Sequence, residues 1–318
     1  MANTISGFFQ TVVAAATEAT QVLKPTWNMH RSIYWDFNPA ERGVLGQTIN
    51  VPIPTDPTAN VADIGSGDNQ LSDVTANTTS IVFDRHPQYG FTIRDFEQFN
   101  SPILLRRLFL DAALTGIKNN INNVICGLLT TSNFTTNSAI SATGHVITIP
   151  QFLQGLGVLA DQRVPVENNP EDMSLLLQSQ PYYTIMDGTT GGSGAAWNQA
   201  FIAGNRIAEQ LRSTGSWPNA YGVSVKLDQQ LPTSGTGGSR TYTAALLHRW
   251  AVAGVSRPLP APDQKVVDFT YMDFDDVSIR IQLGYNLWPK GGYVVIVDAG
   301  YGVKVVRENM CQLYTIAE

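Results

Sequence analysis

Runs of lysine or arginine are missing from this sequence, and charge of either sign is scarce. Charged residues make up 14% of the chain and the formal net charge is −6, whereas about 25% of the residues of an ordinary soluble domain are charged. Strong electrostatic attraction to nucleic acid or to anionic lipid is therefore not expected. The surface must consist largely of Asn, Gln, Ser, Thr and Gly, and such a surface suits burial against other subunits.

Cysteine and histidine are also sparse, and no spacing among them specifies a metal site. Cys126 and Cys311 have no CxxC partner and no neighbouring histidine, so we expect two buried reduced thiols instead of a disulfide framework or a zinc site. The histidines show neither an HExxH motif nor any paired spacing. They are His30, His86, His145 and His248. We predict no metal and no cofactor.

Catalytic motifs are missing as well, since the sequence has no GxSxG elbow and no GxGxxG loop. The glycine-rich residues 188–194 precede an expected helix whose N-terminus could bind an anion, but they lack the Gly-Lys-Ser/Thr ending of a P-loop. Asp273, Asp275 and Asp276 could hold a hard cation, although a solvated turn explains them as well. We predict no catalytic residue and no enzyme; the alternative is a phosphate- or nucleotide-binding enzyme that uses residues 188–194.

No run of eighteen apolar residues occurs, so no segment is expected to cross a membrane. Residues 8–16 are apolar enough to resemble the core of a signal peptide. However, no positive charge precedes them, because Lys24 is the first cationic residue, and Gln10 and Glu18 interrupt the apolar stretch. Secretion is therefore not expected.

Residues 1–45 combine a short amphipathic stretch with several aromatic residues. Phe8 and Phe9 fall at helical spacing with the apolar residues that follow them, and Trp27 and Trp35 come next. This segment is too short to form a core of its own, so it must lie on its parent domain or on a neighbouring molecule. We interpret it as an N-terminal arm with aromatic anchors.

Residues 46–93 predict a long two-stranded extension. Residues 49–53 alternate apolar and polar side chains as a half-buried strand requires, and residues 79–83 begin a second strand that continues to residue 93. Residues 54–78 between them are rich in Pro, Gly, Asp, Asn and Thr and contain few large apolar side chains. A loop this long inside a compact domain is unusual and is more often functional.

The strongest helical pattern follows, at residues 102–130. Ser101 can accept a backbone N–H group as the N-cap, and Pro102 sits where its missing donor is harmless. Apolar residues then recur every three or four positions, while asparagines occupy the other face. At 1.5 Å per residue the helix would span roughly 43 Å, which predicts a spine along a whole domain.

Shorter elements complete the chain. The clearest alternation lies at residues 277–283, 293–297 and 302–306, and the turns between these segments predict a three-stranded antiparallel meander. The other expected elements are helices at residues 150–162 and 195–212 and strands at residues 174–178, 222–227 and 241–247.

Taken in this order, the elements resemble those of the major capsid proteins of tailed bacteriophages, the Hong Kong 97 phage type. Short phrases resemble capsid sequence too. Residues 46–52, GQTINVP, open the extension; residues 221–225, YGVSV, precede a Leu-Pro pair; and residues 299–307, AGYGVKVVR, come near the end.

The resemblance implies an α+β capsid fold with an N-terminal arm, an extended β-hairpin loop, a long spine helix, a peripheral domain and an axial domain. It assigns residues 1–45 to the arm, 46–93 to the extended loop, 94–165 to the peripheral domain with the spine helix, 166–264 to the axial domain and 265–318 to a peripheral β meander. Arm and loop would reach over adjacent subunits. The apolar residues assigned to assembly are Phe8, Phe9, Trp27, Trp35, Ile49, Val51, Ile53, Ile81 and Phe83.

The implied function is that of a major capsid protein, which self-assembles as hexamers and pentamers into an icosahedral shell around phage double-stranded DNA. Its partners would be its own copies, a portal and a separate scaffold or decoration protein, and DNA would be enclosed without sequence-specific binding. Its place would be the virion, and the host cytoplasm during assembly. Residues 46–93 contain no lysine, so a lysine-to-asparagine cross-link cannot come from this loop and a non-covalent shell is predicted. A cellular nanocompartment shell of the same fold is the alternative.

Overall fold

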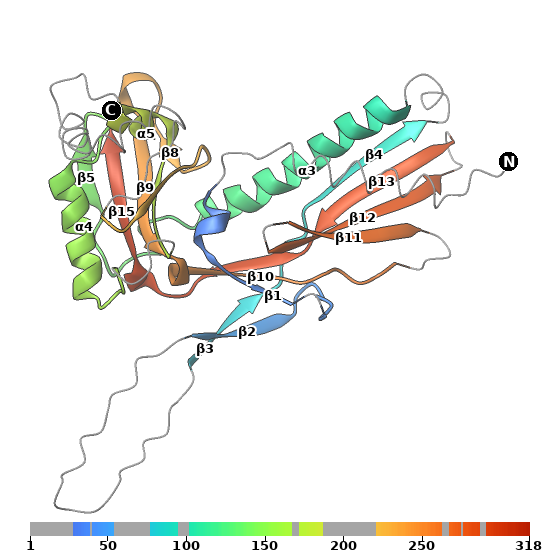
Figure 1. The fold of residues 1–318 in the computed structure, drawn as a ribbon, viewed down its shortest axis with the longest axis horizontal. Coiled ribbons are helices and arrows are strands. Elements are labelled where there is room, and N and C mark those ends of the chain that lie inside the picture. The colour runs from blue at the N-terminus through green and yellow to red at the C-terminus, as the bar shows by residue number, and fades with distance from the viewer. Residues whose placement is uncertain are drawn as a thin grey trace, which may run out of the picture.

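The computed structural model describes residues 28–38, 40–53, 77–94, 102–166, 172–186, 221–262, 267–274, 276–286 and 291–318. The described strands form four sheets, and three α-helices accompany them. Figure 1 shows two lobes joined by a narrow middle sheet, from which a two-stranded hairpin projects. Helices packed on mostly antiparallel sheets confirm the α+β class that the resemblance implies.

The first lobe, which we call the spine lobe, is an antiparallel sheet packed against one long helix. Alternation along the sheet decides which face is covered. Ile279 and Ile281 are completely buried in the same core as the helix, whereas Arg280 between them lies on the opposite face. In spatial order the strands are β11 (Asp268–Phe274), β12 (Val277–Asn286), β13 (Gly292–Ala299) and β4 (Gln88–Arg94).

The helix of this lobe, α3 (Pro102–Cys126), is the predicted spine helix. Its 25 residues span about 37 Å at 1.5 Å per residue. Leu110 and Leu114 are buried one turn apart, as the apolar periodicity predicts. The helix ends four residues before residue 130, because the N–H of Leu128 donates to the carbonyl of Ile125 and closes a tighter turn.

The second lobe, which we call the sheet lobe, consists of a six-stranded sheet and two helices, α4 (Ile149–Asp161) and α5 (Ser179–Met186). All five residues of β6, which pairs with a strand on each side, are buried, as expected of a strand that is covered on both faces. The strands, in spatial order, are β5 (Ile140–Thr143), β15 (Cys311–Ala317), β9 (Thr241–His248), β6 (Met173–Leu177) and β7 (Ser224–Leu227), with β8 (Thr233–Ser234) paired to β9.

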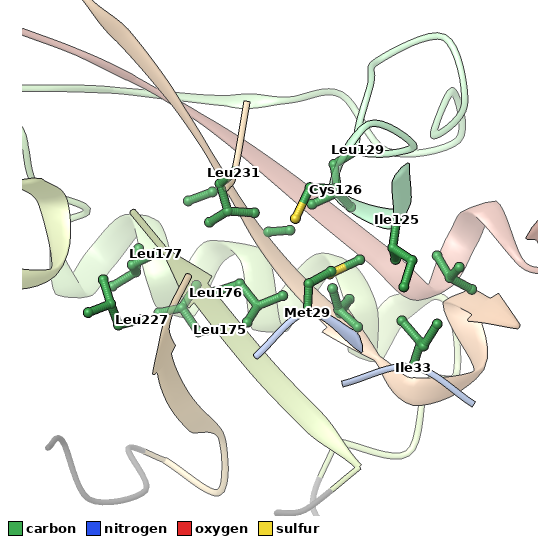
Figure 2. Packing of buried hydrophobic residues seen from close by; sticks show 14 of the residues in the cluster. Met29, Ile33, Ile125, Cys126, Leu129, Leu175, Leu176, Leu177, Leu227 and Leu231 are labelled. Atoms are coloured by element: carbon green, nitrogen blue, oxygen red, sulfur yellow. The ribbon is translucent and has the colours of Figure 1, made fainter. Parts of the chain in front are cut away.

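One hydrophobic core continues from the spine lobe into the sheet lobe. Figure 2 shows where they meet: Cys126 and Leu129 at the end of α3 lie near Leu176 of β6, with Met29 between the two elements. Met29 and Leu176 are completely buried. The two lobes are therefore parts of one packed body.

The middle sheet carries the hairpin. Its strands in spatial order are β1 (Tyr34–Phe37), β10 (Val252–Ser256) and β14 (Tyr301–Val305). The hairpin consists of β2 (Thr48–Ile53) and β3 (Asn77–Val82), which among the described strands pair only with each other. Figure 1 shows the hairpin leaving the middle sheet on the side away from α3.

The C-terminal strands differ from the sequence prediction. The sequence predicts a meander that ends with residues 302–306, but β14 pairs with β10 in the middle sheet, and the third meander strand is β11. β15, β5 and α4 belong with the sheet lobe, although the predicted division assigns all three to the peripheral domain. Alternation looks the same in any sheet, so it cannot tell which sheet a strand joins.

The helix predicted at residues 150–162 is confirmed as α4. Thr148 caps it: its side chain accepts the N–H of Gln151 at 3.3 Å, while the Gln151 side chain accepts the N–H of Thr148 at 2.9 Å. Residues 188–194 and 195–212 lie outside the described residues. Within the described ranges no helix is long and apolar enough to cross a membrane. Short 3-10 turns complete the fold, at His30–Ser32, Gly237–Ser239, Arg249–Ala251 and Glu308–Met310.

Candidate assembly interface

The hairpin has two faces of different chemistry. Ile49 and Ile81 are directly opposed on one face, where Val51 and Ile81 are buried against Ala253 and Val255 of β10. The other face is exposed and consists of Thr48, Asn50, Pro52, Thr78, Ser80 and Val82. The chain's own body thus covers one face, and the second face, which carries no charge, points to solvent.

Phe83, the residue after β3, anchors the hairpin root. Its side chain is completely buried, and its ring lies so close to Gly43 and Gly300 that a Cβ atom at either position would overlap it. The carbonyl oxygen of Val82 lies equally close to Gly302. Three glycines thus form a socket that accepts this part of the hairpin because they have no side chains.

Backbone hydrogen bonds hold the same root. The N–H of Phe83 donates to the carbonyl of Gln47 at 2.9 Å, and the N–H of Gly46 donates to the carbonyl of Phe83 at 2.8 Å. Arg85 and Tyr301 exchange two backbone hydrogen bonds of 3.0 Å. These bonds tie both legs of the hairpin, and they determine where each leg leaves the body.

A buried arginine supports the strands beneath the hairpin. Arg257 follows β10, and its guanidinium donates to the carboxylate of Asp36 at 2.8 Å and to its carbonyl at 2.6 Å. It also donates to the carboxylate of Glu41 at 3.2 Å. The planar guanidinium thereby joins β10, β1 and the segment that leads into the hairpin.

A buried carboxylate anchors the N-terminal side of the described chain. Asp228 is completely buried and accepts the backbone N–H groups of Asn28 and Met29, both at 2.8 Å. It also accepts the side chain of Asn122 on α3 at 3.1 Å and the N–H of Gln230 at 2.9 Å. The chain that precedes residue 28 therefore starts from a fixed point beside α3.

The two cysteines are buried thiols. Cys126 and Cys311 are buried and are not joined in a disulfide. Burial raises the pKa of the Cys126 thiol, and the neighbouring carboxylate of Asp228 raises it further. Burial raises the pKa of the Cys311 thiol. Both thiols stay protonated at neutral pH, so the predicted buried reduced thiols are confirmed.

A second polar cluster lies on the face of the spine-lobe sheet that is opposite α3. Asp298 of β13 is buried and accepts two hydrogen bonds from the guanidinium of Arg280, at 3.0 and 2.6 Å. The side chain of Gln282 donates to the same carboxylate at 3.1 Å, and Nε2 of His86 lies 3.1 Å from it. A carboxylate paired bidentately with arginine is suited to holding strands together and not to proton transfer.

The part of the chain that the structure describes contains no group of three or more His, Cys, Asp or Glu residues able to hold a metal ion. Asp273 lies near the end of β11 and Asp276 in the turn before β12, and both are exposed. Asp275 lies outside the described residues.

All of the described side chains that the sequence assigns to assembly lie in the chain's own packing. Nε1 of Trp35 donates to the carbonyl of His30 at 2.8 Å, and its ring lies against Gly254. A side chain that its own chain encloses helps to position the hairpin. Those packed within the chain are Trp35, Ile49, Val51, Ile81 and Phe83. Those outside the described residues are Phe8, Phe9, Trp27 and the side chain of Ile53.

Sequence reasoning missed a different set of apolar side chains at the hairpin root. Val44, Leu45 and Val82 are 58%, 50% and 47% exposed. Val44 and Leu45 lie before β2, so they belong to no alternating strand pattern. Nothing in the local sequence separates them from buried residues, since exposure here depends on how the turn is placed by its contacts with Phe83.

Comparisons with known proteins give structural matches only: no family model matches the sequence, and neither does any curated protein. The capsid of cyanophage P-SCSP1u is similar at 12% identity and a TM-score of 0.49, covering 90% of this chain and 86% of that one. The capsid of Ralstonia phage GP4 is similar at 10% identity and a TM-score of 0.47, covering 89% of this chain and 86% of that one. The holo-SrpI encapsulin complex of Synechococcus elongatus PCC 7942 is similar at 14% identity and a TM-score of 0.44, covering 92% of this chain and 88% of that one.

These similar structures are phage capsids and an encapsulin complex. The similarity extends over most of each chain, and at 10–14% identity it concerns the fold alone. The described elements follow the order that the resemblance implies for the hairpin, the spine helix, the central region and the closing strands.

Proposed function

We propose that this chain is the major capsid protein of a tailed bacteriophage. It assembles with copies of itself into hexamers and pentamers, and these form an icosahedral shell around double-stranded DNA. Its role is structural and not enzymatic. The observation that carries the proposal is the hairpin β2–β3, which is held rigidly at its root but turns one whole face away from the body that supports it.

The exposed face of the hairpin is suited to contact with a second copy. A two-stranded hairpin alone is at best marginally stable in water, and here only one of its faces is packed on the parent chain. The exposed face carries Val82 and uncharged residues. Covering such a face requires no charge to lose its hydration, which is the main cost of burying polar surface.

The body supports the same role. The two lobes share one core, so the subunit is a stiff, elongated block with the hairpin projecting from its middle (Figure 1). A block of this shape can contact several neighbours at once, as a tile in a shell must. With a net charge of −6 it encloses DNA without binding it strongly.

The proposed partners are other copies of the chain, a portal, a scaffold and a decoration protein. The proposed locations are the virion and, during assembly, the host cytoplasm.

Removal of residues 54–76 tests the function directly. Ile53 and Asn77 are paired in register, so an Asn-Gly turn can join β2 to β3 in place of the removed residues. We expect the variant to keep the circular dichroism spectrum and melting temperature of the parent but to form no particles by electron microscopy, with or without a scaffold. Unfolding of the variant would show that these residues belong to the folding unit.

The control replaces residues 54–76 by a Gly/Ser linker of the same length, which separates the effect of the sequence from that of loop length. The parent chain must itself form particles. A parent that stays a monomer at every concentration, with a radius of gyration near the globular value of about 20 Å, would overturn the proposal.

The content of the particles decides between related functions. Packaged DNA supports a phage capsid, whereas a protein cargo without a genome indicates a cellular nanocompartment. The enzyme alternative is tested by nucleotides and phosphorylated metabolites in a thermal-shift measurement. We expect no shift; a shift that disappears when Gly191 and Gly192 are replaced would favour the enzyme.

A further inference from the structure

An uncharged hollow of about 220 Å³ lies in the face of the spine-lobe sheet that is opposite α3. Its floor is apolar because Val294 and Ile296 of β13 point to this face, opposite Gly284 and Gln282 of β12 in the register. Gly284 leaves the hollow open, since a Cβ atom there would meet only Val267, at 3.9 Å. The lining consists of Val267, Gln282, Gly284, Tyr285, Asn286, Val294 and Ile296, none of them charged.

The size of the hollow favours side chains over a small-molecule ligand. Pockets for small molecules usually measure about 300–1,000 Å³, and the hollow, at 220 Å³, lies below that range. A cavity of about 150 Å³ lined by apolar residues holds benzene. The hollow therefore fits one or two aliphatic side chains from another segment of protein.

The hairpin root carries two such side chains on a rigid turn. Val44 and Leu45 are adjacent, and at least half of each residue is exposed. The N–H of Gln47 donates to the carbonyl of Val44 at 3.0 Å, and the N–H of Val44 donates to the Gln47 side chain at 3.3 Å. Gly46 takes a φ of +86° that closes the turn. A turn already held in this shape loses little conformational entropy when it binds.

We propose that the Val44–Leu45 turn of one copy inserts into the hollow of a second copy of this chain. This inference rests on the proposed function and names one contact within the shell. Turn and hollow match in size, both are apolar, and neither brings a charge that would need a partner. The turn is exposed and the hollow is open, and none of the residues that the structure describes fills the hollow.

The position of the two features determines the kind of contact. The turn belongs to the hairpin root and the hollow to the spine lobe, so the contact joins two different surfaces and repeats from copy to copy around a ring. A stable interface buries at least about 1,000 Å² in total, which one turn cannot supply. The contact therefore orients neighbours that the hairpin also holds.

Engineered cysteines test the contact. The native Cys126 and Cys311 are buried, so oxidation joins only introduced thiols. In particles of the double variant Leu45→Cys and Ile296→Cys we expect a ladder of covalently linked chains on a denaturing gel. Mixed particles in which each copy carries one of the two cysteines should stop at dimers. The pair Val44→Cys and Val294→Cys replaces the first pair if that pair impairs assembly.

The matched control pairs Ile296→Cys with Tyr183→Cys on α5, where Tyr183 is 58% exposed; no ladder is expected. Particles whose linked fraction does not exceed this control overturn the contact and leave the proposed function standing. A parent chain without particles overturns both.

A charge swap provides an independent measurement. Leu45→Asp should raise the protein concentration needed for assembly by about tenfold or more, because a carboxylate would enter an apolar hollow. Adding Val294→Lys to the same chain should bring that concentration back to within about threefold of the parent, since the two charges then meet. Lack of any rescue, while both single variants melt at the temperature of the parent, would contradict the contact.

Discussion

The core of the body and the core of the hairpin root are stabilised in different ways. The body core runs through both lobes and includes completely buried residues such as Leu176 and Leu246. The buried core of the root consists of two residues of the hairpin, Val51 and Ile81, and two of β10. The body is held by the large area that it removes from water, whereas the root is held by shape and backbone hydrogen bonds. Changes in the body should alter global stability, and changes at the root should alter the position of the hairpin.

The largest effect is expected in the body core. Leu246→Ala removes a completely buried side chain from β9 and should lower the free energy of unfolding by about 2–5 kcal/mol. Urea denaturation followed by circular dichroism measures it. Leu153→Ala on α4, where the side chain is 44% exposed, is the control and should change stability little. Equal effects at the two sites would contradict the assignment of the core.

The anchor of the N-terminal segment comes next. Asp228→Ala leaves the buried N–H groups of Asn28 and Met29 without an acceptor, and an unsatisfied buried donor costs about 1–3 kcal/mol. We expect lower stability in urea and faster amide exchange at these two residues. Unchanged exchange would mean that Asp228 does not hold the segment in solution.

A substitution in the glycine socket should affect the hairpin root and leave the body unchanged. Gly300→Ala overlaps the ring of Phe83, and overpacking of this kind costs about 1–3 kcal/mol. We expect faster amide exchange in β2 and β3 and loss of particles, while α3 keeps its protection. Gly157→Ala on α4 is the matched control, because a Cβ atom at this position meets nothing within 4 Å. This substitution should stabilise the helix by about 0.5–1 kcal/mol. Particles with normal protection of the hairpin would contradict the socket.

The smallest effect is a pH dependence that belongs to the body. Burial lowers the pKa of His248; nearby Asp172 opposes this, and Arg249 and Arg307 add to it. Nδ1 of the neutral ring accepts the N–H of Trp250 at 3.3 Å. Because the unfolded chain takes up this proton more readily, stability is full above about pH 6.5 and falls as the pH decreases below it.

Urea denaturation at pH 7.5 and pH 5.5 measures this dependence, and His248→Gln should reduce the difference between the two values. Amide exchange of β2 and β3 should follow the body and show no separate transition. The same loss of stability in the parent and the variant would assign the dependence to other groups.

The elements that the sequence predicts correctly are those whose cause is local. The capping of α4 by Thr148 depends on residues within one helical turn, and the buried positions of α3 follow a periodicity of three to four residues. The strands β2 and β3 follow from alternation and from the turn-forming residues between them. No distant contact is needed to recognise these elements.

The features that the sequence did not predict depend on distant contacts. Val51 and Phe83 were expected to be apolar contact residues of an extension, and they are apolar, but the body of the same chain covers them. The covering residues are Ala253 and Gly300, more than 190 positions away. Alternation shows that one face of a strand avoids water, and it does not show which surface takes the place of water.

The sequence by itself determined the spine helix, the two hairpin strands and the scarcity of charge, because each depends on residue type and spacing along the backbone. Only the tertiary structure decided that β14 lies beside β10, that β15 joins the sheet lobe, and that Val44 and Leu45 remain exposed. Strand partners and exposure result from packing between segments far apart in the chain, and the period of a strand is the same whichever partner it has.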